Sequence, residues 1–494
     1  MQKWYHSQTA VFLTLLIVLL LTGWLRWFHF DSFPPGLWYD EAYHLATAQR
    51  IAQGVDAPLL YYPEKTGEPA FFWLTAVALR LGAGHLAPRW VAAVAGWVSV
   101  LLLFGAAHDI LRPRLGHDAA WVAVGSAAIL GSNYAFLFNS RMGWEPTLAT
   151  AVIIAAVWLF WRALRDGRRR DFLGAGIVIG ITPYTSVIAR SLPLLLLLIG
   201  LLWLPQMRHQ WRSRLVSGAL LGGTAVFLLS PLLRLFITQP ELFNRRLAAA
   251  AEPATWARNF GLTLAGFLWR SGKALHSLPD RPIFGPALAV LLLIGSGVAL
   301  WYWKRTSFLV WLLWLFSFIP AGMLSSPAPV FYRILPAVPA AAVLATLGGY
   351  WCIQQAARLS GRVQPIMAAL IVGVFLFSGW TSSRDYLVRW AALPNLSGLM
   401  DAGKWQAAKT ILAADTETAV FVTIPAEQEP TVQYAVQSRQ PTPRTFDGQY
   451  CLVVPAKNEQ PLHFLSINGY EHRSLPLLES LYETALVTTD PFFA

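Results

Sequence analysis

Two adjacent carboxylates near the N-terminus, Asp40 and Glu41, lie among residues suited to binding a sugar. A carboxylate here could accept a proton from a hydroxyl group, as general acid–base catalysis requires. Taken alone, the pair is equally well explained as an N-terminal helix cap, since backbone N–H groups and the helix dipole favour carboxylates there. The neighbouring side chains favour the chemical interpretation because they combine flat apolar faces with hydrogen-bonding tips; they are Trp38, Tyr39, Tyr43 and His44.

A third carboxylate, Glu145, lies in the short turn Asn139–Pro146 between two apolar runs, beside Arg141. A helix cap before Pro146 again explains it on its own. We expect this turn on the same side of the membrane as Asp40. Two carboxylates facing one cleft could divide the roles of base and of orienting or metal-binding group. A divalent cation is therefore a candidate cofactor, although the sequence assigns no metal ligands.

Three basic residues are expected on that same side: Lys65, Arg190 and Arg333. Each alone is explained as an anchor that extends towards the lipid headgroups. As a set they lie on the side where positive charge is not favoured, so they need an explanation. A phosphate group provides one, because cationic donors stabilise both a bound phosphate and its charge as a leaving group.

The elements that must position these residues are membrane spans. The 494-residue chain is 55% hydrophobic and only 13% charged, against roughly 25% charged residues in ordinary soluble domains. About eleven apolar runs are long enough, or nearly so, to cross a bilayer core, which takes ~20 helical residues. They are Ala10–Phe28, Val91–Ala107, Ala119–Phe138, Leu148–Trp161, the Gly- and Pro-containing Phe172–Ala189, Leu192–Leu204, Leu215–Phe236, Pro286–Trp303, Phe308–Leu324, Leu335–Ile353 and Ile366–Trp380.

Basic residues fall in alternate loops and predict the orientation, because cytoplasmic loops carry an excess of Lys and Arg. The N-terminus is then cytoplasmic and the C-terminal segment extracytoplasmic. The net charge of +12 comes from these short loops, so it implies no nucleic-acid partner. The cytoplasmic set is Lys3, Arg112, Arg114, Arg162, Arg165, Arg168, Arg169, Arg170, Arg208, Arg212, Arg214, Lys304, Arg305, Arg358 and Arg362.

Outside the spans, the sequence predicts two outer stretches and a terminal domain. The loop 29–88 carries the acidic motif on a helix over Asp40–Gln53 that ends at Gly54, followed by an interfacial helix over Pro69–Leu81. The stretch Ile237–Phe284 is expected along the outer surface. Residues 1–383 form the transmembrane domain, and residues 384–494 form a small α/β domain. Its expected helices are Gly398–Ala414 and Leu475–Thr484, and its expected strands are Ala419–Ile424, Tyr450–Pro455 and Ala485–Thr488.

The order and sidedness of these features resemble the GT-C glycosyltransferases, specifically the protein O-mannosyltransferase-like and aminoarabinose-transferase-like group. The resemblance covers roughly residues 10–350, and it departs from the family where many members have Asp and this chain has Glu145. The matching features are Tyr39-Asp40-Glu41 and the helix after it, Glu64-Lys65 before the interfacial helix, Pro88-Arg89 opening the next span, an acidic residue before Pro146, Arg190, and Tyr332-Arg333 before a late span.

This resemblance implies a mainly α, polytopic transmembrane bundle of GT-C type in a prokaryotic inner membrane. It implies inverting transfer of a sugar from a polyprenyl-phosphate carrier to a glycan, lipid or protein acceptor on the outer face. Asp40 is then the catalytic base or its partner, with Glu41 beside it and Glu145 as a further acidic group. Lys65, Arg190 and Arg333 hold the phosphate, and the expected substrate contacts are Tyr39, Tyr43, His44 and Tyr332.

Two alternatives stay open. A transporter or flippase of lipid-linked glycan would have ionisable residues near the middle of its spans and paired interrupted helices in two similar halves. In this sequence most charges lie at span ends, and no halves repeat. A non-catalytic scaffold would tolerate replacement of the acidic and basic outer residues.

Overall fold

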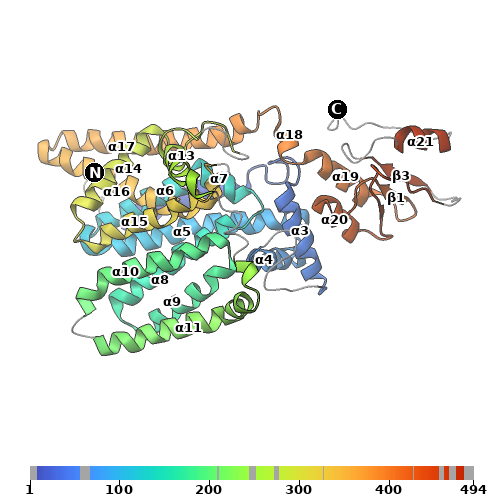
Figure 1. Cartoon of the computed structure of the whole chain (residues 1–494). Coiled ribbons are helices and arrows are strands. Elements are labelled where there is room, and N and C mark those ends of the chain that lie inside the picture. Colours follow the sequence, from blue (N-terminus) through green and yellow to red (C-terminus); the bar gives the residue numbers. More distant parts are fainter. Residues whose placement is uncertain are drawn as a thin grey trace.

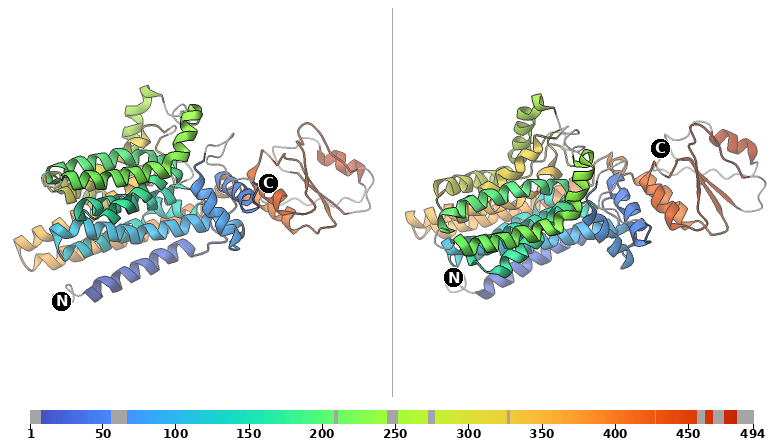
Figure 2. Two further views of the ribbon diagram at one scale, coloured as in Figure 1. Left: turned by 90° about the horizontal axis from the view of Figure 1, so that it is seen from below. Right: turned by 60° about the horizontal axis from the view of Figure 1, so that its bottom comes forward.

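The protein is an elongated helical bundle with a smaller domain at one end (Figure 1). The computed structural model describes residues 8–55, 67–207, 211–243, 252–271, 277–325, 328–426, 428–455, 461–466 and 474–482. The first described helix starts at the end of the bundle opposite the C-terminal domain, and all three views agree on this (Figures 1 and 2).

The bundle consists of long helices that carry apolar side chains on all sides. Such helices suit a membrane interior, because their backbone hydrogen bonds are made within the helix and their surfaces are apolar. Among the described residues, seven helices are long and apolar enough to span a membrane, or eight if α6 and α7, bent by 57°, count as one. The chain is thus a multi-pass membrane protein, and the count of about eleven spans stays a prediction. The bundle helices are α2 (Gln8–Trp27), α5 (Ala87–Leu115), α6 (Asp118–Ser132), α7 (Tyr134–Arg141), α8 (Pro146–Asp166), α9 (Arg169–Ile181), α10 (Leu192–Met207), α11 (Trp211–Thr238), α14 (Pro286–Trp301), α15 (Thr306–Phe318), α16 (Val338–Leu359) and α17 (Val363–Arg384).

Shorter elements accompany the long helices, and α3 and α4 lie at the end of the bundle that faces the C-terminal domain (Figure 1). The predicted interfacial helix is α4, twelve residues long, which packs against α3 and α5. The predicted outer stretch 237–284 contains α13. These elements are α3 (Tyr39–Ala52), α4 (Pro69–Arg80), α13 (Trp256–Leu268), the 3₁₀ turns η1 (Gly84–Leu86), η2 (Thr182–Tyr184), η3 (Val187–Ser191), η5 (Pro253–Thr255), η6 (Ile319–Gly322) and η7 (Phe331–Ala337), and the π-helical turn η8 (Asp385–Trp390).

Glycines let two helices of the bundle core approach closely. A Cβ added at Gly295 on α14 would overlap the carbonyl of Leu344 on α16, and one added at Gly348 on α16 would overlap the carbonyl of Leu291. Small residues at such crossings are typical of packed membrane helices. The core therefore centres on α5, α6, α8 and α14–α16, whereas only 6% of the apolar window is buried on α11 and on α17.

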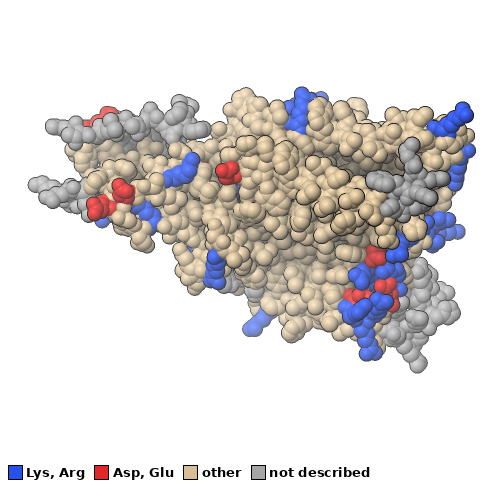
Figure 3. Space-filling model, turned by 180° about the vertical axis from the view of Figure 1, so that it is seen from behind, with Lys and Arg blue, Asp and Glu red and all other residues tan. Residues whose placement is uncertain are grey.

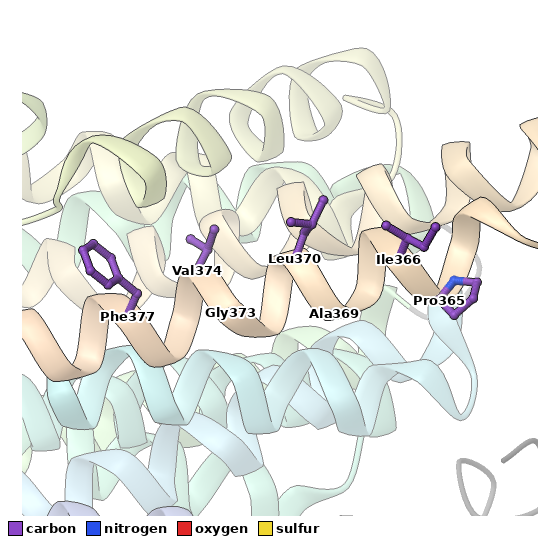
Figure 4. A pocket seen from close by; sticks show the side chains of 7 residues that line it. All are labelled: Pro365, Ile366, Ala369, Leu370, Gly373, Val374 and Phe377. Carbon is purple, nitrogen blue, oxygen red and sulfur yellow. The ribbon is translucent and has the colours of Figure 1, made fainter.

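The exposed side of α17 carries a shallow apolar hollow (Figure 4). No charged or hydrogen-bonding side chain lines it, and its first residue, Pro365, lies in the first turn of α17. Such a surface fits lipid tails and offers nothing to hold a sugar or a phosphate. Its lining residues are Pro365, Ile366, Ala369, Leu370, Gly373, Val374 and Phe377.

Charged side chains collect at the end of the bundle away from the C-terminal domain, and most of the face between the two ends is uncharged (Figure 3). There Arg165 lies 2.5 Å from Asp109 and 2.6 Å from Asp166, and Arg162 lies 3.8 Å from Asp171. This network joins α5 to the end of α8 and the start of α9, where the largest group of predicted cytoplasmic arginines lies.

The C-terminal domain has a three-stranded parallel sheet in the order β2-β1-β3. The expected helices are present, and the strand predicted from Ala419 is β1. The strand predicted over Tyr450–Pro455 is wrong, because those residues are irregular; β2 and β3 take its place in the sheet. Residues 485–488 lie outside the described ranges. The elements are α18 (Leu396–Leu399), α19 (Ala402–Ala413), β1 (Ala419–Val422), α20 (Pro430–Ser438), β2 (Arg444–Thr445), β3 (Leu462–Leu465) and α21 (Ser474–Leu481).

Candidate active site

Helix α3 carries the acidic pair in its first turn and matches the predicted helix closely. Its end is fixed at Gly54, which has a φ of 76°. The N–H of Gly54 donates to the Ile51 carbonyl and that of Val55 to the Arg50 carbonyl, the two bonds of a Schellman ending. At its start the N-cap residue is Trp38, whose side chain makes no cap hydrogen bond. Asp40 and Glu41 therefore lie inside the first turn and not at the N-cap position itself.

The two carboxylates of the pair have different surroundings. Asp40 is half-buried, whereas Glu41 is completely buried. Arg89, in the first turn of α5, donates from Nε to Glu41 Oε1 at 2.6 Å and from Nη2 to Oε2 at 3.0 Å. This bidentate pair fixes α3 to α5 and occupies both oxygens of Glu41.

The turn that contains Glu145 packs directly on this pair. A Cβ added at Gly143 would lie 2.7 Å from Glu41 Oε1 and 2.6 Å from the Pro88 side chain. A residue with a side chain would thus push the turn away from α3. Gly143 lets the second outer turn reach the acidic helix.

The turn brings Glu145 to His44. Glu145 Oε2 lies 3.5 Å from His44 Nε2, and the two side chains are 24% and 9% exposed. His44 follows Asp40 by four residues, so the two share one face of α3. Burial lowers the pKa of His44 below its ordinary value, although the nearby Glu145 carboxylate opposes this effect. Asp40 and His44 thus lie on one face of α3, and Glu145 meets this face at His44.

Aromatic rings enclose this face on two sides. The ring of His44 lies 4.9 Å from that of Phe71 and 4.8 Å from that of Phe72, and Tyr43 lies 5.9 Å from Phe72. On the other side Trp144, next to Glu145, lies 5.0 Å from Trp38 and 4.8 Å from Tyr332. The predicted substrate-binding residues Tyr43, His44 and Tyr332 therefore come together around the Glu145 turn. Tyr39, also predicted, is half-buried at the start of α3.

Arg190 lies at the edge of this group, in η3, which packs against α8. Its Nη2 is 3.5 Å from Oε1 of Glu68, the buried residue that precedes α4. The guanidinium also lies 5.2 Å from the ring centre of Phe236 and 4.9 Å from that of Phe243. Since Phe71 and Phe72 lie one turn after Glu68, a single turn of α4 joins Arg190 to His44.

Of the other two predicted phosphate ligands, Arg333 reaches this group through Tyr332, whose ring centre lies 5.9 Å from its guanidinium. Arg333, in η7, donates to the Leu324 carbonyl at 3.1 Å and lies 3.5 Å from Ser325 Oγ. Lys65 lies outside the described residues, as does Glu64. Within the described ranges, His, Cys, Asp and Glu side chains form no group of three or more that could hold a metal ion.

The sequence analysis missed the parts played by Arg89, Glu68 and Gly143. Arg89 had been noted only for its place before a span, although an arginine in the first turn of a buried helix needs a buried acidic partner. That requirement is the signal that could have paired it with Glu41.

Comparisons with known proteins concern the family and the fold of the chain. The family described as dolichyl-phosphate-mannose-protein mannosyltransferase matches residues 64–233. No curated protein matches the chain. The structure of ArnT from Cupriavidus metallidurans bound to undecaprenyl phosphate superimposes with a TM-score of 0.55 at 15% identity, covering 90% of this chain and 87% of that one.

A second solved structure is similar over most of the chain. The oligosaccharyltransferase of Archaeoglobus fulgidus in its apo form gives a TM-score of 0.55 at 13% identity, covering 89% of this chain but only 65% of that longer one. The protein therefore has the fold of the GT-C glycosyltransferases, as its sequence predicts. The resemblance to the protein O-mannosyltransferase-like and aminoarabinose-transferase-like group is confirmed by the family match and by the likeness to ArnT.

Proposed function

We propose that this protein transfers a sugar from a polyprenyl-phosphate carrier to an acceptor on the outer face of the membrane, with inversion at the anomeric carbon. The observation that carries the proposal is the face of α3 that Asp40 and His44 share, which Glu145 meets at His44, with Arg190 one turn of α4 away. The family match and the bound undecaprenyl phosphate in ArnT support the choice of donor.

Asp40 is the base in this proposal. It takes the proton of the acceptor group as the acceptor atom bonds to the anomeric carbon. The bond from that carbon to the phosphate oxygen breaks at the same time, and polyprenyl phosphate leaves. Glu145 and His44 orient the acceptor or Asp40. Glu41 serves to position the helix, because Arg89 engages both of its oxygens.

Arg190 holds the donor phosphate in this scheme, together with Lys65 and Arg333. The Arg190 guanidinium lies 3.5 Å from Glu68 and against the rings of Phe236 and Phe243, which places a cation at the edge of the aromatic group. Charge-assisted bonds of this kind stabilise the phosphate as its charge grows in the transition state. The aromatic side chains Tyr39, Tyr43 and Tyr332 cover the sugar.

The site faces outward in this proposal. It lies at the end of the bundle next to the C-terminal domain, and the basic turns gather at the other end (Figure 3). Reporters fused after Asp166 and Arg212 are expected to read as cytoplasmic, and one fused after Ala494 as external. A cytoplasmic C-terminus would reverse the assignment of faces.

The test is Asp40→Asn in the purified full chain, with Asp31→Asn as the control for an exposed carboxylate in the same outer segment. Because Asn keeps the size of Asp but accepts no proton, transfer should fall by a factor of ~10² or more while expression and donor binding persist. Glu145→Gln should also lower transfer. Mass spectrometry of lipid and glycan products follows the reaction. Near-parental transfer by a folded Asp40→Asn protein would refute Asp40 as the base.

A lipid-linked glycan transporter is the competing function, and buried charge within the spans would favour it. Arg26 and Arg141 are both fully buried, but they lie in the last turns of α2 and α7 and donate to backbone carbonyls. These bonds indicate a structural role for both arginines, which link α2 to its neighbouring helices. Translocation of a labelled lipid-linked sugar without any new glycosidic product would favour the transporter.

A further inference from the structure

The C-terminal domain supplies a carboxylate to the start of α3. Asp401, just before α19, accepts a hydrogen bond at 3.1 Å from the N–H of Tyr39 to its Oδ2. Tyr39 is the first residue of α3, and the side chain of the N-cap residue, Trp38, makes no cap hydrogen bond. One of the N–H groups at the start of α3 that the helix itself leaves unpaired is therefore bonded by a residue 362 positions away.

Asp401 is itself held in place by its domain. Lys404 Nζ lies 3.0 Å from Asp401 Oδ1 and 2.9 Å from Oε2 of Glu429, which is buried. Asp401 has a φ of 50°, in the left-handed region that Asp and Asn tolerate better than most residues. The carboxylate is thus aimed at α3 by both its backbone and its partner.

The backbones of the two parts also meet at this point. Gly36, in the loop before α3, has a φ of 74°, and a Cβ added there would lie 2.6 Å from Ala402 Cα and would overlap the Met400 carbonyl. The Gly36 carbonyl in turn accepts from Arg89 Nη2 at 2.7 Å. The segment Met400–Ala402 is therefore seated on the loop that leads into the acidic turn.

Further contacts hold the rest of α3. Gln49 Nε2 donates to Ser438 Oγ on α20 at 2.8 Å. Trp405 and Tyr434 of the C-terminal domain pack on the apolar cluster that contains Leu37 and Leu45. The domain thus contacts α3 near both of its ends and along one side.

We propose that the C-terminal domain is part of the catalytic apparatus and that Asp401 is a positioning residue for Asp40. This inference rests on the proposed function, in which Asp40 is the base. Asp401 binds the amide of the residue immediately before Asp40, so its loss leaves the first turn of α3 free to fray. A base that shifts by ~1 Å loses much of its effect on the reaction.

Three variants of the full chain test the inference. Asp401→Gly removes the acceptor and suits the left-handed backbone. Asp401→Asn keeps an oxygen that can accept the Tyr39 N–H in the same conformation. Asp415→Gly, at an exposed carboxylate after α19, is the matched control.

The measurements are hydrogen exchange of the amides at the start of α3, binding of undecaprenyl phosphate, and kcat for transfer. In Asp401→Gly we expect the amides at the start of α3 to exchange about 5- to 30-fold faster, which is the scale of a lost helix cap. We expect kcat for transfer to fall by a factor of ~10 or more. Binding of undecaprenyl phosphate should stay within about twofold because Arg190 is untouched. Asp401→Asn and Asp415→Gly should resemble the parent.

The opposite results would overturn the inference. Parental exchange and kcat in Asp401→Gly would show that Asp401 does not order α3. A fall in kcat accompanied by an equal loss of undecaprenyl phosphate binding, or by equal damage in Asp401→Asn, would indicate a general structural role. If the parent itself makes no glycosidic product, the proposed function fails, and the exchange measurement still decides whether Asp401 orders α3.

Discussion

Arg89 and Glu41 form a buried bidentate ion pair, with Nε 2.6 Å from Oε1 and Nη2 3.0 Å from Oε2. The same guanidinium donates to the carbonyls of Pro34 at 2.9 Å and Gly36 at 2.7 Å. One side chain therefore joins the start of α5, the acidic turn of α3 and the loop before it. Of two adjacent carboxylates, the pair holds Glu41 in place, whereas Asp40 is half-buried.

Replacing Arg89 with Gln should destabilise the protein strongly. It leaves the Glu41 carboxylate buried without its cation, which typically costs ~3–5 kcal/mol. Thermal unfolding of the purified protein measures the loss. The double variant Arg89→Gln/Glu41→Gln should recover part of it because no buried charge remains. If the double variant is no more stable than Arg89→Gln, the burial of an unpaired charge does not explain the effect.

Gly143→Ala should separate the Glu145 turn from α3. The new methyl group would lie within 3 Å of both Glu41 and Pro88, and overpacking of this kind costs about 1–3 kcal/mol. Because the turn carries Glu145, sugar transfer should fall further than stability alone explains. Gly174→Ala on α9, where an added Cβ meets nothing within 4 Å, is the control. Equal activity in the two variants would remove the argument for a tight fit at Gly143.

Local patterns in the sequence predicted the helices near the site well. The first-turn carboxylates and Gly54 delimit α3, and Pro69 opens α4, because these signals act within a few residues. The bend between α6 and α7 was missed, since Ala119–Phe138 is one apolar run. There Asn133 accepts from Phe136 N at 3.1 Å and donates to the Ile283 carbonyl at 2.8 Å. That second partner is 150 residues away and invisible to a local pattern.

The residues of the site were predictable by type but not by partner. Asp40, His44 and Glu145 can be picked out of the sequence because ionisable residues beside apolar membrane runs usually have a structural or functional role. Their assignment to separate tasks depends on Arg89 and Asp401, which reach the acidic turn from other elements. A single sequence shows that a buried carboxylate needs a partner and does not show which of several arginines provides it.

Arg190→Ala should weaken the use of the donor more than it weakens folding. Each charge-assisted bond to the phosphate is worth ~1.5–3 kcal/mol, so undecaprenyl phosphate should bind at least ~10-fold less tightly. Since the change also removes the guanidinium 3.5 Å from the buried Glu68, Arg190→Ala/Glu68→Gln is needed as a partner variant. It should regain stability but not donor binding. Recovery of both would mean that Arg190 serves Glu68 and not the donor.

Acidification should destabilise the protein through His44. Burial lowers the pKa of His44 in the folded state, so the unfolded chain takes up a proton first as the pH falls through the ordinary histidine value of ~6.5. The folded state then loses stability from about pH 7 downwards, until the folded imidazole is protonated as well. His44→Gln should flatten this fall in thermal stability between about pH 7.5 and 5.5, whereas His463→Gln, on the exposed edge of β3, should keep the parental profile. The measurement is the melting temperature of all three proteins across that range. Identical pH profiles for the parent and His44→Gln would show that the imidazole beside Glu145 gains its proton as easily in the folded protein as in the unfolded chain.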